Sequence, residues 1–253
     1  MPFIENRGLK IHYKVEGSGS ALVLIHGGLS SLEDWYDVEY VTQLKDDFKL
    51  ILVDLRGHGS SEQPEEPAMY SYDFMVEDIV KVLDELDIDK VHVAGFSFGG
   101  WFVYGLAEAI PERLLSMIIL DGVPGLNDEE NLRFLLSNDE AFSGLAGFFP
   151  HPIRERLLKV DKEKYLLMVG SLGKAVPKIL ERINKLIQHA KTPCLVITSE
   201  YEGHSEDFEL MKKTANSISD SVLITKKGFT HQDILIRSDE IIPHIKEFLN
   251  DLK

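Results

Sequence analysis

The sequence predicts an α/β fold in which one mostly parallel sheet of about eight strands is doubly wound, with helices on both faces. Three observations predict it: short runs rich in Val, Ile and Leu recur along the chain, helical patterns lie between several of them, and one long helix-like segment interrupts the alternation. Near-continuous apolar runs are typical of parallel strands buried on both faces. Strands that alternate with helices indicate a doubly wound sheet, whose ligands gather beyond the carboxyl ends of the strands.

The strands begin with a predicted antiparallel hairpin. A short strand near Phe3–Glu5 is followed by a turn at Asn6-Arg7-Gly8 and by an alternating pattern from Leu9 to Val15. The later strands are the apolar runs Leu22–Ile25, Leu50–Val53, Val91–Ala94, Met117–Leu120, Leu195–Ile197 and Val222–Ile224.

The helices are predicted from apolar residues spaced three and four positions apart. The clearest pattern covers Tyr72–Leu86, and others cover Trp101–Ala109, Phe208–Ser217 and Glu240–Leu249. From about residue 125 to 190 the chain is helix-like without an intervening strand, and we interpret this segment as a helical cap inserted above the site. Residues 1–253 are then one domain. The alternative is two ordinary crossover helices with long loops, which are uncommon in compact domains.

Composition excludes several classes of partner. The formal net charge of -15 repels phosphate backbones and anionic lipid surfaces, so neither nucleic acid nor a membrane is an expected partner. The one cysteine, Cys194, lies in an apolar run, which predicts a buried thiol in a reducing compartment. The first residues lack the features of a signal peptide and no apolar run reaches membrane-spanning length, so a cytoplasmic protein is expected.

The strongest chemical motif is the segment from Gly95 to Gly99, which reads Gly-Phe-Ser-Phe-Gly. It lies directly after a predicted strand and directly before a predicted helix. A sharp strand-to-helix turn projects a serine hydroxyl above the sheet and leaves no room for side chains two positions away on either side. Ser97 is therefore the candidate nucleophile, and the backbone N–H of Phe98 is a candidate oxyanion donor. The alternative is a glycine-rich turn whose serine merely caps the helix.

With these residues the sequence resembles the α/β-hydrolase superfamily, over most of the chain outside roughly 125–190. His26-Gly27-Gly28 resembles the oxyanion loop of that family, and the segment Asp54–Ser61 resembles a second hallmark after the next strand. The resemblance implies that the backbone N–H of Gly28 is the second oxyanion donor. It also implies that His26, Arg56 and His58 shape their loops and have no catalytic role.

A serine nucleophile needs a base, and the base needs an orienting acid. In the superfamily both follow the serine along the chain. His231 resembles the catalytic histidine because it follows a late strand through a Gly-bearing loop. The family pattern for the acid falls on Glu202, where most members have Asp. Asp121, at the end of the preceding strand, is the leading alternative, and Glu200 is a weaker one.

The resemblance implies a serine hydrolase that cleaves carboxylic esters or lactones of small molecules and needs neither a metal nor an organic cofactor. A serine at position 97 disfavours the haloalkane dehalogenase and epoxide hydrolase members, which attack with a carboxylate. Trp35, Phe148 and Phe149 are candidates for an apolar substrate pocket. Thioesterase, amidase, carbon–carbon hydrolase and perhydrolase activities use the same residues, and a small-ligand sensor on this scaffold is the alternative of another class. The sequence does not predict the oligomeric state.

Overall fold

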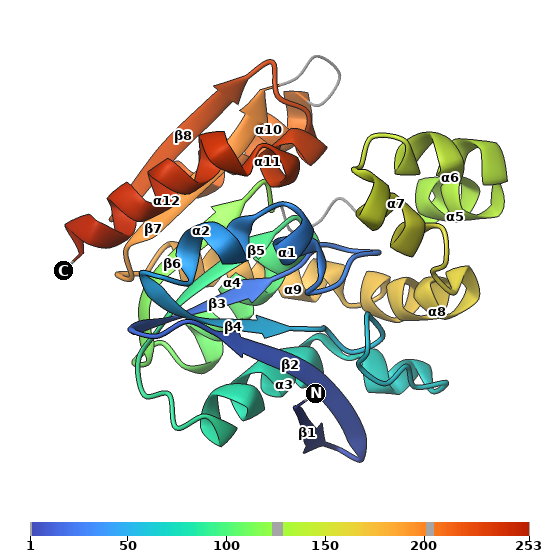
Figure 1. Ribbon diagram of the computed structural model, residues 1–253, viewed down its shortest axis with the longest axis horizontal. Coiled ribbons are helices and arrows are strands. Elements are labelled where there is room, and N and C mark those ends of the chain that lie inside the picture. Colours follow the sequence, from blue (N-terminus) through green and yellow to red (C-terminus); the bar gives the residue numbers. More distant parts are fainter. Residues whose placement is uncertain (1, 123–128, 201–204, 253) are drawn as a thin grey trace.

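The computed structural model describes residues 2–122, 129–200 and 205–252, and these residues form a sheet of eight strands (Figure 1). The order across the sheet is β1-β2-β4-β3-β5-β6-β7-β8. The strands are β1 (Phe3–Asn6), β2 (Leu9–Glu16), β3 (Ser20–Ile25), β4 (Phe48–Val53), β5 (Val91–Phe96), β6 (Leu114–Leu120), β7 (Cys194–Glu200) and β8 (Ser221–Lys227). The predicted fold class is confirmed, and every predicted apolar run lies in a strand.

The register of the parallel strands brings their carboxyl ends to one edge of the sheet. Strands β1 and β2 form the predicted antiparallel hairpin, β2 also pairs antiparallel with β4, and the strands from β4 to β8 pair in parallel. Phe96 of β5 pairs with Leu120 of β6, which in turn pairs with Ile197 of β7. The residues that directly follow β5 and β6 are therefore neighbours.

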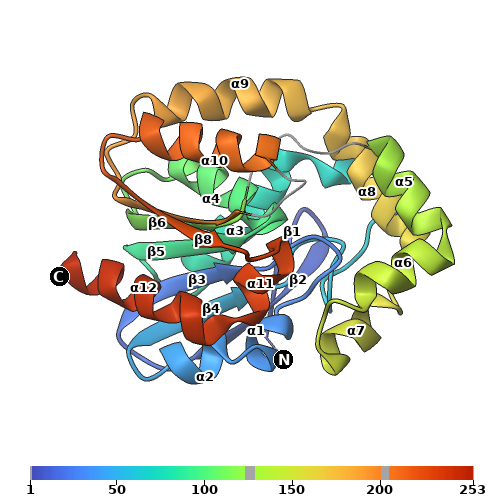
Figure 2. The same cartoon turned by 90° about the horizontal axis from the view of Figure 1, so that it is seen from above.

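Helices cover both faces of the sheet (Figure 2). Those of one face are α3 (Tyr72–Glu85), α4 (Phe98–Ala109), α9 (Val176–Ile187) and α10 (Ser205–Ser217). Those of the other are α1 (Asp34–Asp37), α2 (Tyr40–Leu44), α11 (His231–Ile236) and α12 (Ser238–Asp251).

Alternate residues of a strand face the two helical layers. In β3, Val23 and Ile25 belong to one apolar cluster, whereas Leu22 and Leu24 belong to the other. All four side chains are fully buried. This two-sided burial is the reason that the central strands carry nearly continuous apolar sequence.

The described residues between β6 and β7 are mostly helical, as predicted for the cap insertion. Besides α9 it holds α5 (Glu129–Ser137), α6 (Asp139–Ala146), α7 (His151–Leu157) and α8 (Lys162–Gly173). Figure 1 shows α5 to α8 as a group beside the core. This group, called the cap below, has a small apolar cluster of its own, formed by Leu136, Phe142, Ala146 and Leu157.

Polar contacts fasten the helical insertion to the core at several points. Arg156 on α7 donates a 2.6 Å hydrogen bond to the buried Asp34 of α1. Arg182 on α9 forms a 2.8 Å ion pair with Glu108 of α4. On α8, the Ser171 hydroxyl donates a 2.6 Å hydrogen bond to the carbonyl of Pro67, which begins the short 3₁₀ helix η1 (Pro67–Tyr70). The insertion is thus bonded to both helical layers.

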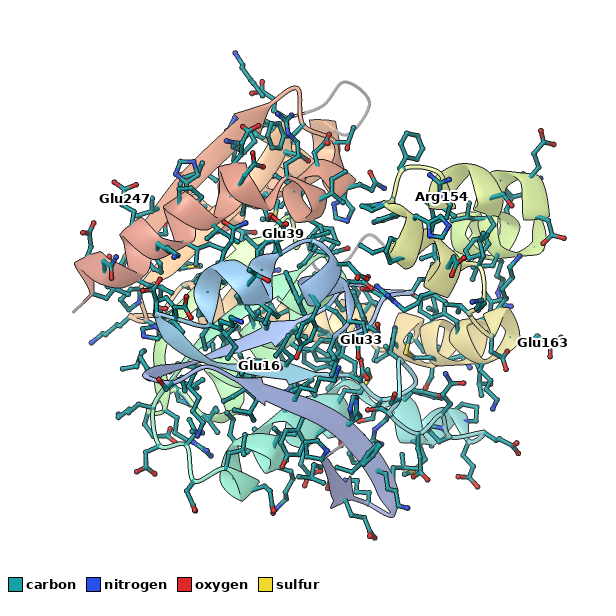
Figure 3. The ribbon with its side chains drawn as sticks, viewed as in Figure 1. Glu16, Glu33, Glu39, Arg154, Glu163 and Glu247 are labelled. Carbon is teal, nitrogen blue, oxygen red and sulfur yellow. The ribbon has the colours of Figure 1, made fainter. Side chains whose placement is uncertain are left out.

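Within the cap, Arg154 stabilises the connection from α6 to α7. Its guanidinium donates to the carbonyl oxygens of Gly147 and Phe149 at 3.0 and 3.3 Å, and its side chain lies near α7 in Figure 3. The guanidinium of Arg154 therefore satisfies backbone carbonyl groups of this connection.

Two smaller predictions can be compared with the fold. Helix α4 begins at Phe98, three residues before the predicted start at Trp101. Cys194 is fully buried in β7, and burial raises the pKa of its thiol to about 12. None of the helices in the described ranges combines the length and the apolar character that a membrane crossing requires.

Candidate active site

Ser97 occupies a strained turn between β5 and α4. Its φ and ψ are 53° and -119°, and a positive φ is unfavourable for a residue with a Cβ. The turn is tight on both sides, because a side chain at Gly95 would collide with the backbone of Gly99, and one at Gly99 would collide with the backbone of Ile25. The two glycines of the motif are thus required by close backbone approach, as the spacing predicted.

His231 bridges Ser97 and Asp121. Its Nε2 lies 2.9 Å from the Ser97 Oγ, and its Nδ1 lies 2.9 Å from the Asp121 Oδ2. A carboxylate accepts but cannot donate, so Nδ1 carries the proton of the neutral ring and Nε2 accepts the serine proton. The arrangement is a continuous chain of hydrogen bonds from hydroxyl to imidazole to carboxylate.

The position of His231 follows from the start of α11. Thr230 caps this helix through a reciprocal pair of hydrogen bonds with Asp233, which fixes the turn in which His231 is the first helical residue. The Phe96 ring stacks on the imidazole with 4.9 Å between centroids and an interplanar angle of 27°. The buried Phe96 side chain therefore supports one face of the histidine ring.

Asp121 is held by three further hydrogen bonds from the end of β7. Its Oδ1 accepts from the Thr198 hydroxyl at 2.8 Å and from the Ser199 backbone N–H at 3.2 Å, and its Oδ2 accepts from the Ser199 hydroxyl at 2.6 Å. Burial acts to raise the pKa of this carboxyl, but the hydrogen bonds and the charge of His231 outweigh burial, so its pKa lies below the ordinary value. Asp121 is thereby held as a carboxylate.

Of the two candidate acids, the structure brings Asp121 to the base. Neutral His231 carries one proton on Nδ1. The hydrogen bond from this N–H is accepted by Asp121, the alternative acid. Glu202 itself lies outside the described residues. The weaker candidate Glu200 ends β7, where it pairs with Lys227 of β8. The structure also brings Thr198 and Ser199, which the sequence analysis did not identify, to the carboxylate of Asp121.

The predicted oxyanion loop follows β3 and packs against the nucleophile turn. A Cβ placed on Gly27 would lie 3.4 Å from the Ser97 Cβ, and one on Gly28 would lie 3.8 Å from the Phe98 Cβ. Gly28 and Phe98, the two candidate oxyanion donors, therefore belong to adjoining segments beside Ser97.

His26 bonds to the backbone of its loop, which fits the structural role that the resemblance implied. Its Nδ1 donates to the carbonyl of Gly27 at 2.7 Å, and its Nε2 accepts from the backbone N–H of Leu55 at 3.0 Å. Burial lowers its pKa, which keeps the ring neutral. Both ring nitrogens are thus engaged by the backbone.

Arg56 and His58 are also buried, and their side chains contact groups of the protein interior. The Arg56 guanidinium forms a two-pronged contact with Asp78, at 2.9 and 2.7 Å, and donates to the carbonyl of Met69 at 2.6 Å. Burial lowers the pKa of His58 to about 3. In the described parts of the chain, no group of three or more His, Cys, Asp and Glu side chains is arranged to hold a metal ion.

The predicted pocket residues have three different environments. Trp35 is fully buried and packs edge-on against Tyr40, with 4.8 Å between ring centroids, so its prediction as a pocket residue is wrong. Phe148 is 63% exposed in the connection between α6 and α7. Phe149 is partly buried and packs against both the core and the cap cluster. Tyr165 of α8 approaches the oxyanion loop from the helical insertion, and the sequence analysis did not identify it.

Comparison with known proteins agrees with this architecture. Residues 20–251 match the family model described as the alpha/beta hydrolase fold. The chain belongs to this family. The α/β hydrolase is 31% identical over 120 residues to a putative 2-succinyl-6-hydroxy-2,4-cyclohexadiene-1-carboxylate synthase of Bacillus subtilis, an alignment that covers 46% of this chain and 43% of the relative.

Two other similar proteins are named for different activities. The α/β hydrolase is 36% identical over 121 residues to a soluble epoxide hydrolase of a Corynebacterium species, covering 47% of this chain and 40% of that protein. The matched segments thus span less than half of either curated relative. The solved enol-lactonase of Burkholderia xenovorans superposes with a TM-score of 0.80 at 20% identity, over 98% of this chain and all of that one. At that identity the superposition shows a shared fold.

Proposed function

We propose that this α/β hydrolase is a serine hydrolase that cleaves carboxylic esters or lactones of small molecules through a covalent acyl-enzyme. The observation that carries the proposal is the hydrogen-bonded chain Ser97–His231–Asp121, with both bridging distances at 2.9 Å. A nucleophile, a base and an orienting carboxylate in this geometry are the requirements of acyl transfer by serine.

In the first half of the reaction, the Ser97 Oγ attacks the carbonyl carbon while its proton moves to Nε2 of His231. Asp121 accepts the Nδ1 hydrogen bond and stabilises the imidazolium that forms. The backbone N–H groups of Gly28 and Phe98 bind the oxyanion, and one such donor contributes about 3–4 kcal/mol to transition-state stabilisation. His231 then protonates the leaving alkoxide, and in a lactone this alkoxide stays attached to the acyl group.

In the second half, His231 takes a proton from water while the water oxygen attacks the acyl carbon. The bond from that carbon to the Ser97 Oγ then breaks, His231 returns the proton to Oγ, and the acid is released. In both halves of the reaction the transferred proton is thus carried by Nε2 of His231. The hydroxyl nucleophile distinguishes this proposal from the chemistry of the epoxide hydrolase members, which the sequence analysis associated with a carboxylate nucleophile.

A substrate panel tests the proposal. It contains p-nitrophenyl esters of increasing acyl length, five- and six-membered lactones, a thioester, an anilide and an epoxide. The wild type is compared with Ser97→Ala and with the control Ser137→Ala, which removes an exposed hydroxyl on α5. Ester or lactone turnover that falls by about 10⁴-fold or more in Ser97→Ala alone is the expected result. Equal rates in wild type and Ser97→Ala, or turnover of the epoxide alone, would refute the proposal.

A further inference from the structure

The middle of the oxyanion loop is held by the cap. Leu29 directly follows Gly28 and has a φ of 60°, which is unusual for a residue with a branched side chain. Its side chain is partly buried against the apolar cluster of the cap, formed by Leu136, Phe142, Ala146 and Leu157. A strained backbone persists only where its surroundings fix it, and here the cap supplies part of the surroundings.

Tyr165 of α8 supplies a second contact at the same point. Its hydroxyl lies beside the backbone N–H of Leu29, which acts to lower the pKa of that hydroxyl, although burial raises the pKa overall. The hydroxyl oxygen is so close to Gly28 that a Cβ at this position would collide with it. The Tyr165 ring stands edge-on to His58, with 5.7 Å between centroids and an angle of 89°, so the hydroxyl is directed by packing.

Hydrogen bonds to core residues hold the loop near its two ends. At the beginning, His26 bonds to the backbone of Gly27 and Leu55. At the far end, the Asp54 carboxylate accepts from the backbone N–H of Leu32 at 2.8 Å. Between these anchors lies Gly28, whose N–H must point at the oxyanion. Besides Phe98 of the core, the side chains that approach Gly28 and Leu29 are Tyr165 and those of the cap cluster.

From these contacts we infer that Tyr165 and Leu29 are positioning residues, through which the cap sets the orientation of the Gly28 N–H in the oxyanion hole. The inference rests on the proposed function. It makes the cap a part of the catalytic machinery even for a substrate that is too short to contact it. The loss of either contact leaves the loop tethered at its ends and frees the donor between them to rotate away from the oxyanion.

The test uses Tyr165→Phe and Leu29→Ala with p-nitrophenyl acetate, whose acyl group is a single methyl. We expect kcat to fall about tenfold in each variant, with KM changed less than about twofold, because loosening a donor costs less than deleting it. A trifluoromethyl ketone, which forms a tetrahedral oxyanion adduct with the serine, measures the same interaction at equilibrium. Its inhibition constant should rise by the same factor by which kcat/KM falls.

Ser171→Ala is the matched control, since it removes another cap-to-core hydrogen bond from the same helix, at 2.6 Å, without touching the oxyanion loop. It should leave kcat and ketone inhibition at wild-type values. Circular dichroism shows whether each variant is folded, and Leu29→Met, which keeps the cap contact, should restore the rate lost in Leu29→Ala.

Two results would overturn the inference: unchanged kcat in both Tyr165→Phe and Leu29→Ala, or a loss confined to KM with ketone inhibition unchanged. Failure of the proposed function is distinguishable, because a fluorophosphonate would then fail to label Ser97 in the wild type. If the wild type is labelled while the variants keep full kcat, only the role of the cap is refuted.

Discussion

Asp121 and His231 are separated by 110 positions in the chain, and their Oδ2 and Nδ1 atoms lie 2.9 Å apart. The two residues meet because β6 and β8 end at the same edge of the sheet, with β7 between them. The end of β7 contributes the hydroxyls of Thr198 and Ser199, which hold the carboxylate between the strands. Three neighbouring strand ends therefore build the acid and base of the site.

The first prediction concerns the identity of the acid. Asp121→Asn keeps the shape of the side chain but removes the charge that orients and stabilises the imidazolium, so kcat should fall by about 10⁴-fold. Glu202→Gln should leave kcat within a few-fold of wild type. Steady-state kinetics on one activated ester measures both. A large loss of kcat in Glu202→Gln with little change in Asp121→Asn would instead identify Glu202 as the orienting acid.

The second prediction concerns the pH dependence of stability. The pKa of Asp121 is lowered from 3.8 in the folded protein, so the ionised carboxylate stabilises the fold above that pH, and the stabilisation is lost as the pH falls through the folded-state pKa. Ser199→Ala removes one donor and raises the folded-state pKa. Urea unfolding should therefore show a destabilisation of about 1 kcal/mol at neutral pH that diminishes as the pH falls below 3.8.

Thr225→Ala, which changes a hydroxyl on the edge strand β8, is the control for that series. Its effect should not depend on pH in the acid range. A Ser199→Ala destabilisation that is equally large at neutral and acid pH would contradict the role of Ser199 in holding the ionised carboxylate.

The third prediction couples Gly28 to Tyr165. A methyl group at Gly28 would collide with the Tyr165 hydroxyl, so Gly28→Ala should displace the loop and lower kcat, by about 10²-fold for a shift near 1 Å. Tyr165→Phe removes the obstructing oxygen. In the double variant kcat should therefore be higher than in Gly28→Ala alone, and a double-mutant cycle measures this coupling. Strictly additive losses would show that the two positions do not touch.

The fourth prediction concerns the buried ion pair of Arg56 and Asp78, which are at most 1% exposed. Removal of one partner leaves a buried charge without compensation, so Asp78→Asn should lower the free energy of unfolding by about 3–5 kcal/mol. At temperatures near its unfolding midpoint, part of Asp78→Asn is unfolded and inactive. At low temperature, where the variant is fully folded, it should keep the wild-type kcat. Urea unfolding and kinetics at the same temperature measure the two effects, and a loss of kcat in fully folded Asp78→Asn would contradict a purely structural role.

The strands and the tight turn at Ser97 could be predicted from sequence because their signals are local. The apolar runs reflect burial on both faces, and the Gly95–Gly99 spacing reflects backbone contacts within one turn. The short helices α1 and α2 were not predicted, since four or five residues carry too little periodicity.

The acid and the pocket could not be predicted in the same way, because both depend on tertiary contacts. Asp121 reaches His231 across the edge of the sheet, and the donors that hold its carboxylate come from Thr198 and Ser199 on another strand. Trp35 illustrates the same limit, since an aromatic residue near the site in sequence is fully enclosed by its neighbours.

The central claim, that Ser97 is activated by His231 and forms a covalent adduct, is tested most directly by intact-protein mass spectrometry after treatment with a fluorophosphonate. In that reaction the Ser97 oxygen displaces fluoride at phosphorus and its proton passes to His231. The predicted result is one adduct per chain, located at Ser97 by peptide mapping, absent in Ser97→Ala and formed at least about 10²-fold more slowly in His231→Ala. Labelling elsewhere, or equal labelling of wild type and Ser97→Ala, would contradict the account.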